Sequence, residues 1–246
     1  MSIETPDELK GLKAAGRIVA QAIRAMRQQV RPGITTAELD EIGACVFARA
    51  GARSGPQLDY GFPGVTCISV NDEAVHGIPG PRRLRRGDLV KLDVTAELDG
   101  FYADACVSVP VTPAAPETLR LISVTRQALE RALRTARTGT PINHIGRVVE
   151  HVVAARGYAV CAELMGHGIG RRIHEWPDIP NYDAPGASAP LTEGLVITIE
   201  PIISAGTGAV RPTRDGWTVK TADGARSAHF EHTIVVTGGQ PVMLTA

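Results

Sequence analysis

The hydrophobic pattern between residues 88 and 109 is the clearest structural signal in the chain. Every second residue from Val90 to Leu98 is apolar, which is the period-2 pattern of a half-buried strand. Asp99 and Gly100 then form a typical two-residue hairpin turn, and a second alternating run returns through residues 101–109. This register makes Asp93 and Asp104 diagonal neighbours on the polar face, with Cα atoms about 7–8 Å apart.

Two aspartates at this separation repel each other unless a cation lies between them. Most aspartates on exposed strand faces point into water instead. The hairpin alone therefore leaves two interpretations open, a solvated face and a cation site.

Two later apolar segments also carry a carboxylate. Residues 194–199 lead to Glu200, after which Pro201 cannot donate to a strand ladder, and a further strand predicted over residues 229–236 has Glu231 near its start. The glycines around His167 predict a loop with positive φ or close backbone approach, and no second histidine stands four residues away as in the helical zinc motif. Four carboxylates and one imidazole suit two divalent cations, which favours metal-assisted hydrolysis.

The first half of the chain has two helix start signals, and two further predicted helices occupy matching places in the second half. Residues 5–8 and 35–38 each combine a threonine with a glutamate three residues later, which is the capping-box pattern. Further helices are predicted near residues 117–136 and 142–156. The order helix, helix, strands is thus repeated, which predicts an α+β fold with helices on one side of a mainly antiparallel sheet. We expect a single domain, 1–246, with related halves of roughly 1–112 and 113–246.

The composition and charge of the chain limit the classes of partner that it can bind. The chain has 246 residues and a formal net charge of zero, so no DNA partner and no membrane partner is expected. Residues 82–86 contain four arginines and fit either a solvated loop or a transient contact with ribosomal RNA. The four cysteines have neither metal nor redox spacing, and no signal peptide or apolar span is present, which indicates a cytoplasmic protein with reduced thiols.

Six segments in order carry a resemblance to a known family. They are the pair Asp93 and Asp104, the glycine-rich segment at 166–170, Ile-Glu-Pro at 199–201, Phe-Glu-His-Thr at 230–233, residues 67–79 and residues 215–221. Together they resemble the bacterial-type, type I methionine aminopeptidases of peptidase family M24, from about Asp7 to the last strand. Only about 25 residues separate His174 from Glu200, which favours type I.

The resemblance implies a pita-bread (creatinase/aminopeptidase) fold, a monomer, and removal of the initiator methionine from nascent proteins whose second residue is small. It also implies two divalent ions, with Co, Mn or Fe expected and Zn compatible. The implied metal ligands are Asp93, Asp104, His167, Glu200 and Glu231. The implied catalytic residues are His76, His174 and Glu200. The implied substrate-binding residues are His76, His174, Tyr60, Phe62, Cys67 and Trp217.

Two positions depart from the family pattern, because Asp59 and Ile173 stand where many relatives have aromatic residues. Two alternatives remain. A Xaa-Pro aminopeptidase or prolidase shares the implied fold and ligands but normally has a large additional amino-terminal domain. A non-catalytic binding protein on the same scaffold would be expected to have lost metal ligands, whereas all five are present.

Overall fold

The computed structural model describes all 246 residues. Its main element is a nine-stranded sheet in the order β1-β4-β5-β14-β9-β7-β8, with β2 added to β4 and β15 added to β14. Two three-stranded sheets, β13-β10-β6 and β11-β12-β3, lie beside it. All strand pairs are antiparallel, as the sequence predicted. The strands are β1 (Arg53–Ser54), β2 (Cys67–Val70), β3 (Glu73–Val75), β4 (Leu89–Leu98), β5 (Phe101–Pro110), β6 (Ala159–Val160), β7 (Gly166–Gly168), β8 (Glu175–Ile179), β9 (Val196–Ile199), β10 (Ile202–Ser204), β11 (Val210–Pro212), β12 (Val219–Thr221), β13 (Ser227–His229), β14 (Glu231–Val235) and β15 (Val242–Met243).

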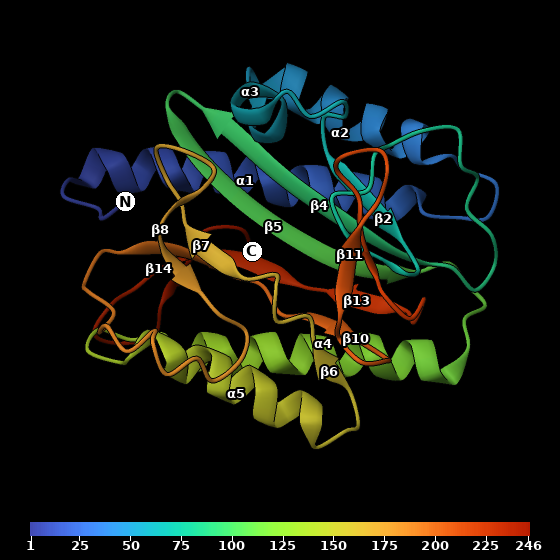
Figure 1. The fold of residues 1–246 in the computed structure, drawn as a ribbon. Helices are drawn as coiled ribbons and strands as arrows, with labels where there is room; N and C mark the ends of the chain where they lie inside the picture. Colours follow the sequence, from blue (N-terminus) through green and yellow to red (C-terminus); the bar gives the residue numbers. More distant parts are fainter.

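Two helix pairs flank the curved sheet, and they follow the two halves of the chain (Figure 1). The first pair is α1 (Pro6–Gln29) and α2 (Thr36–Ala50), and the second is α4 (Pro116–Thr135) and α5 (Ile142–Ala154). A short helix, α3 (Gly55–Tyr60), lies near α2. Both predicted capping boxes are present at the start of α1 and α2. No helix has both the length and the apolar run needed to cross a membrane.

The helix pairs bury one face of the sheet. The first pair packs on apolar side chains of β4 and β5, such as Leu92 and Ala103. The second pair packs on β9 and β14, through Ile197, Ile199 and Ile234. These apolar side chains lie on the face opposite the carboxylates, because strand residues alternate between faces. The fold therefore leaves the acid-bearing face free to form a site.

The register of the hairpin formed by β4 and β5 is confirmed, because Leu98 pairs with Phe101 and Thr95 pairs with Asp104. The prediction of a half-buried strand is wrong. The polar face is covered as well, since Lys91 is 1% exposed and Glu97 is 2% exposed. Segments distant in sequence cover this face, so the alternation identified the face but not its burial. The Lys91 Nζ, for example, donates to the Ser227 carbonyl of β13 at 3.2 Å.

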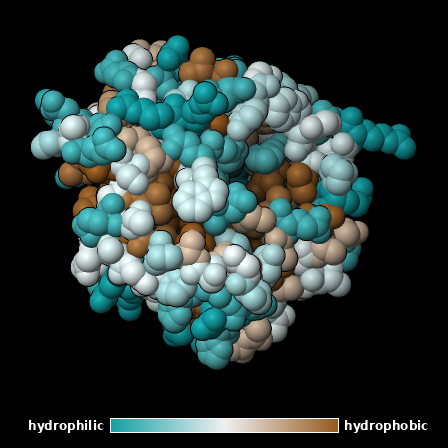
Figure 2. Space-filling model, turned by 60° about the vertical axis from the view of Figure 1, so that its left-hand side comes forward, coloured by the Kyte–Doolittle hydropathy of each residue, from teal (hydrophilic) through white to brown (hydrophobic).

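Figure 2 shows one face of the molecule, on which hydrophilic residues are widespread and hydrophobic residues gather in several patches, the larger of them on the left and to the right of the middle. Few large apolar side chains are exposed anywhere. The exposed ones are Leu58, Tyr60, Leu119, Trp176 and Met243.

The contact between α5 and the chain at residues 180–182 generates a prediction. A Cβ atom at Gly146 would lie 2.1 Å from the Tyr182 carbonyl oxygen and 2.5 Å from that of Pro180. We expect Gly146→Ala to lower the free energy of unfolding by more than about 2 kcal/mol, because backbone atoms cannot yield as side chains do. Denaturant titration measures this loss.

Gly43→Ala is the matched control in α2. There the new Cβ would meet only side-chain atoms, Met26 Sδ and Thr66 Cγ2, each at 3.1 Å. We expect a change within about 1 kcal/mol, since the gain in helix propensity offsets the crowding. Equal losses in the two variants would show that the backbone contact at Gly146 does not limit stability.

Candidate metal centre

The five residues predicted as metal ligands converge on the sheet face opposite the helices. Asp93 lies in β4, Asp104 in β5 and His167 in β7, whereas Glu231 begins β14 and Glu200 directly follows β9. All five line one cavity of about 260 Å³. Ligand atoms of Asp104, His167 and Glu231 lie within 4.8 Å of one another. The structure thus brings the whole set together.

Threonine hydroxyls hold two of the four carboxylate residues, Asp104 and Glu200. The Thr95 hydroxyl donates to Asp104 Oδ2 at 2.7 Å, and the Thr198 hydroxyl donates to Glu200 Oε1 at 2.9 Å. The Thr233 hydroxyl accepts from the Asp104 N–H at 2.8 Å and donates to the Asp104 carbonyl at 2.7 Å. These neutral groups fix the carboxylates without supplying positive charge.

The segment around His167 is the short strand β7, so the predicted loop is wrong. The predicted close backbone approach is correct. A Cβ at Gly166 would lie 2.7 Å from the Thr198 carbonyl oxygen, and one at Gly168 would lie 2.3 Å from that of Trp176. The glycines therefore let β7 lie between two backbones. His167 Nδ1 lies 2.8 Å from the Gly168 carbonyl oxygen, to which it donates, so Nε2 is left as an electron-pair donor toward the cavity.

The buried carboxylates have no lysine or arginine partner. The nearest basic side chains are neutral histidines, such as His167, whose Nε2 lies 3.5 Å from Glu200 Oε1. Burial, with mutual repulsion, raises the pKa of Asp93, Glu200 and Glu231 well above the ordinary value. Burial also raises the pKa of Asp104 to about 6 and lowers the pKa of His167 to about 3.

The unsatisfied atoms of this cluster fit a metal. Asp104 Oδ1 and Glu231 Oε1 are buried without any hydrogen-bond partner. Ionised carboxylates and a neutral imidazole are the donor set expected for Mn²⁺, Fe²⁺, Co²⁺ or Zn²⁺. Divalent cations would offset the buried negative charge and occupy the free lone pairs. The cavity therefore contains a buried His/Asp/Glu metal-binding cluster.

An apolar wall adjoins the cluster within the same cavity. Phe62 and Trp217 meet edge to face, with ring centroids 5.2 Å apart. Cys67 of β2 pairs in register with Asp93 of β4, so the apolar wall begins directly beside a carboxylate. The predicted wall residues all line the cavity, together with Ile173: Tyr60, Phe62, Cys67 and Trp217.

His174 stands between the cluster and α3. Its Nδ1 lies 2.6 Å from the Tyr60 hydroxyl, and its ring centroid lies 4.1 Å from that of His167. Asp59 supports this arrangement, because its carboxylate accepts from the Ile173 N–H at 3.2 Å and from the Tyr102 hydroxyl at 2.8 Å. The departure at Asp59 thus ties α3 and β5 to the segment that carries His174.

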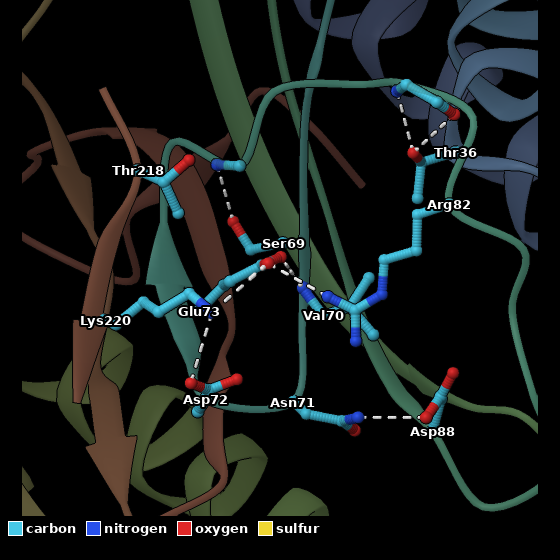
Figure 3. A network of polar contacts seen from close by, with 12 residues as sticks. Thr36, Ser69, Val70, Asn71, Asp72, Glu73, Arg82, Asp88, Thr218 and Lys220 are labelled. Atoms are coloured by element: carbon cyan, nitrogen blue, oxygen red, sulfur yellow. Dashed lines mark hydrogen bonds and ion pairs between the residues drawn. The ribbon is translucent and has the colours of Figure 1, made fainter. Parts of the chain in front are cut away.

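His76 lies at the cavity edge in a left-handed backbone conformation, with φ of 57°. A network of polar contacts holds the adjoining segment (Figure 3). The Gly77 N–H donates to Ser69 Oγ at 2.9 Å, and Glu73 accepts from the Val70 N–H at 2.7 Å and from Arg82 at 2.9 Å. These bonds hold a conformation that costs a non-glycine residue about 1–3 kcal/mol.

One cavity residue was missed in the sequence. His229 ends β13, and its Nε2 lies 3.7 Å from Glu200 Oε2 and 3.6 Å from Glu231 Oε2. Its position two residues before Glu231 was the only sequence signal that could have placed it in the cavity. That signal is weak, because the strand pairing changes at Phe230 between β13 and β14.

Comparison with known proteins agrees with this geometry. Residues 10–238 match the model of the family described as metallopeptidase family M24. The chain is 43% identical over 247 residues to methionine aminopeptidase 2 of Bacillus subtilis, covering 100% of this chain and 99% of that protein. The crystal structure of methionine aminopeptidase from Thermotoga maritima superimposes with a TM-score of 0.96 at 37% identity, covering 100% of this chain and 99% of that one.

Prolidases are more distant. The prolidase from Pyrococcus furiosus gives a TM-score of 0.81 at 23% identity, and the match covers 99% of this chain but 65% of that one. This likeness shows the shared fold alone. The full-length relatives and the family match show that the chain has the pita-bread fold and belongs to metallopeptidase family M24 and, within it, to the methionine aminopeptidases.

Proposed function

We propose that this protein is a metallo-aminopeptidase that removes the initiator methionine from nascent proteins when the second residue is small. The observation that carries the proposal is the single cavity in which an apolar wall adjoins a buried cluster of carboxylates and imidazoles. The wall of aromatic rings and a thiol suits a flexible thioether side chain. The substrates are the amino-terminal methionyl peptides of other proteins.

Asp93, Asp104, His167, Glu200 and Glu231 would hold two divalent ions, Co, Mn, Fe or Zn. When bound, the ions supply positive charge that polarises the scissile carbonyl and makes a water molecule more acidic. The substrate's α-amine lies at the Asp93 end of the cluster, because Cys67 of the side-chain pocket is in register with Asp93. An internal peptide bond offers no such amine, so the enzyme is an exopeptidase.

The protein's own side chains move the protons. Glu200 accepts the proton of the attacking water and delivers it to the leaving amine, while Thr198 holds its Oε1 in place. His174 donates from Nε2 to the carbonyl oxygen as negative charge develops there. The Tyr60 hydroxyl lies 2.6 Å from Nδ1, and with the hydroxyl as the donor the proton of the neutral ring stays on Nε2. His76 contacts the substrate amide.

Further parts of the proposal concern the whole molecule. Residues 1–246 form a single catalytic domain, with related halves of roughly 1–112 and 113–246, and the protein is a monomer of the cytoplasm. Arg82 is engaged by Glu73, and Arg83 donates to the Gly33 carbonyl at 2.8 Å. The exposed Arg85 and Arg86 are therefore the residues that would make a transient contact with the ribosome.

Substrate preference tests the function. We expect rapid methionine release from Met-Ala-Ser and little release from Met-Leu-Ser or Met-Arg-Ser, because the family's pocket beyond the scissile bond is shallow. Chelated enzyme refilled with Mn²⁺, Fe²⁺ or Co²⁺ is assayed by amino-acid analysis. Ala-Pro-Ala is the control substrate. Its cleavage in place of Met-Ala-Ser would assign the chain to the proline-specific branch.

The pairing of Tyr60 with His174 gives a second prediction. We expect His174→Ala to lower kcat by about 10²–10³-fold with little change in metal content, a typical loss for one transition-state donor. Tyr60→Phe should lower kcat by roughly 10-fold, because the ring loses the bond that sets its tautomer. In the His174→Ala background, Tyr60→Phe should have no further effect on kcat. Independent, multiplying losses would separate Tyr60 from His174.

Metal removal should change how stability depends on pH. In the metal-free protein the buried carboxylates bind protons more tightly when folded than when unfolded, since their pKa values are raised. The contribution of these carboxylates to the free energy of unfolding therefore falls as pH rises from the ordinary carboxyl range toward neutrality. In the loaded protein the ions hold the carboxylates ionised, so the difference in Tm should widen between about pH 5 and pH 7.

Scanning calorimetry with and without chelator measures this difference. Asp104→Asn should shrink it, whereas Asp183→Asn, which removes a surface partner of Arg147, should leave it unchanged. Equal Tm values for loaded and stripped wild-type protein at pH 7 would contradict the proposed site.

A further inference from the structure

His229 is a buried histidine whose imidazole ring makes no hydrogen bond. It is 2% exposed, and neither Nδ1 nor Nε2 has a hydrogen-bond partner. Two neighbouring histidines differ, because Nδ1 of the buried His167 meets the Gly168 carbonyl and Nδ1 of the half-buried His232 lies 2.9 Å from Thr245 Oγ1. A buried polar group without a partner costs free energy, so the unpaired ring nitrogens of His229 need an explanation.

The surroundings of His229 Nε2 indicate which kind of partner this atom has. The atom lies 3.7 Å from Glu200 Oε2 and 3.6 Å from Glu231 Oε2, whereas N–H···O bonds measure about 2.7–3.2 Å. Ligand atoms each about 2.1 Å from one ion stand roughly 3.0–3.4 Å apart at octahedral or tetrahedral angles. The spacing is thus too long for hydrogen bonds and close to that of ligands around a cation. Glu200, His229 and Glu231 each offer a ligand atom within 4.8 Å of the others.

The backbone of His229 is held so that its ring keeps this position. The Ser108 hydroxyl of β5 donates to the His229 carbonyl at 2.9 Å and accepts from its N–H at 2.8 Å. Two residues earlier, the Lys91 ammonium donates to the Ser227 carbonyl. Both ends of β13 are therefore fixed to the main sheet, and the ring borders the cavity.

We propose that His229 is a metal ligand, with Nε2 joining Glu200 and Glu231 around one ion. The inference rests on the proposed function for the presence of the ions. Glu231 then belongs to two groups of candidate ligand atoms, Asp104–His167–Glu231 and Glu200–His229–Glu231, and the centre as a whole has two imidazoles. A second nitrogen donor shifts the preference of the centre from Mn²⁺ toward Co²⁺ and Zn²⁺.

Titration of chelator-stripped, full-length protein with Co²⁺ tests the inference. Calorimetry gives the affinity of each binding event, and the visible absorption of Co²⁺ reports its ligands. We expect both His229→Ala and His229→Gln to weaken one binding event by about 10-fold or more and to alter the absorption. His232→Gln is the matched control, a half-buried histidine on the opposite face of β14, and should leave both readings unchanged.

Glutamine separates ligation from hydrogen bonding, because it can donate to carboxylates but is a poor ligand for Co²⁺. Wild-type affinity in His229→Gln would overturn the inference, and so would unchanged binding in His229→Ala. X-ray absorption of the unaltered protein holding two Co²⁺ ions gives an answer that needs no variant. One imidazole per cobalt on average is expected, and one per two cobalts would contradict ligation by His229.

Methionine release from Met-Ala-Ser distinguishes failure of this inference from failure of the proposed function. Cobalt binding that depends on His229, without methionine release by the wild type, would contradict the function alone. Methionine release with binding that is indifferent to His229 would contradict the inference alone.

Discussion

Negative charge buried without a positive side chain is the constraint on which the rest of the structure depends. Four carboxylates share one cavity, and no lysine or arginine pairs with any of them. Lys91 lies two residues from Asp93 on the same strand face, yet its Nζ donates to the Asn71 carbonyl at 2.8 Å and to Ser227. The fold therefore holds Asp104 and Glu200 by neutral threonine hydroxyls and leaves the charge of all four carboxylates for divalent cations to balance.

Local sequence signals predicted the parts of the fold that depend on local chemistry. The Asp99-Gly100 turn and the alternation fixed the register of β4 and β5, and the two capping boxes fixed the starts of α1 and α2. The burial of Lys91 was not predictable, since β13, which lies more than 130 residues away, covers it. The glycines around His167 predicted a loop because glycine allows positive φ and close backbone approach, and here the close approach lets the strand β7 lie between two backbones.

The residues of the candidate site also divide into those that local sequence signals predicted and those that they did not. Carboxylates at the ends of apolar strands were visible in the sequence because a charge beside a buried run is unusual. His229 was not, because it lies before a break in strand pairing and has no flanking pattern of its own. The resemblance marked Asp59 only as a departure. The structure gives it contacts with Ile173 and Tyr102, through which α3 is joined to the segment that presents His174.

The two halves of the chain meet where the charge is concentrated. In the main sheet the junction is the pairing of β5 with β14, which has two register pairs, Glu231 with Cys106 and His232 with Ala105. Asp93 and Asp104 come from the first half, and His167, Glu200 and Glu231 come from the second. Without cations, repulsion between these carboxylates acts directly on a short junction. With cations the same carboxylates join the halves, so metal binding contributes to folding as well as to catalysis.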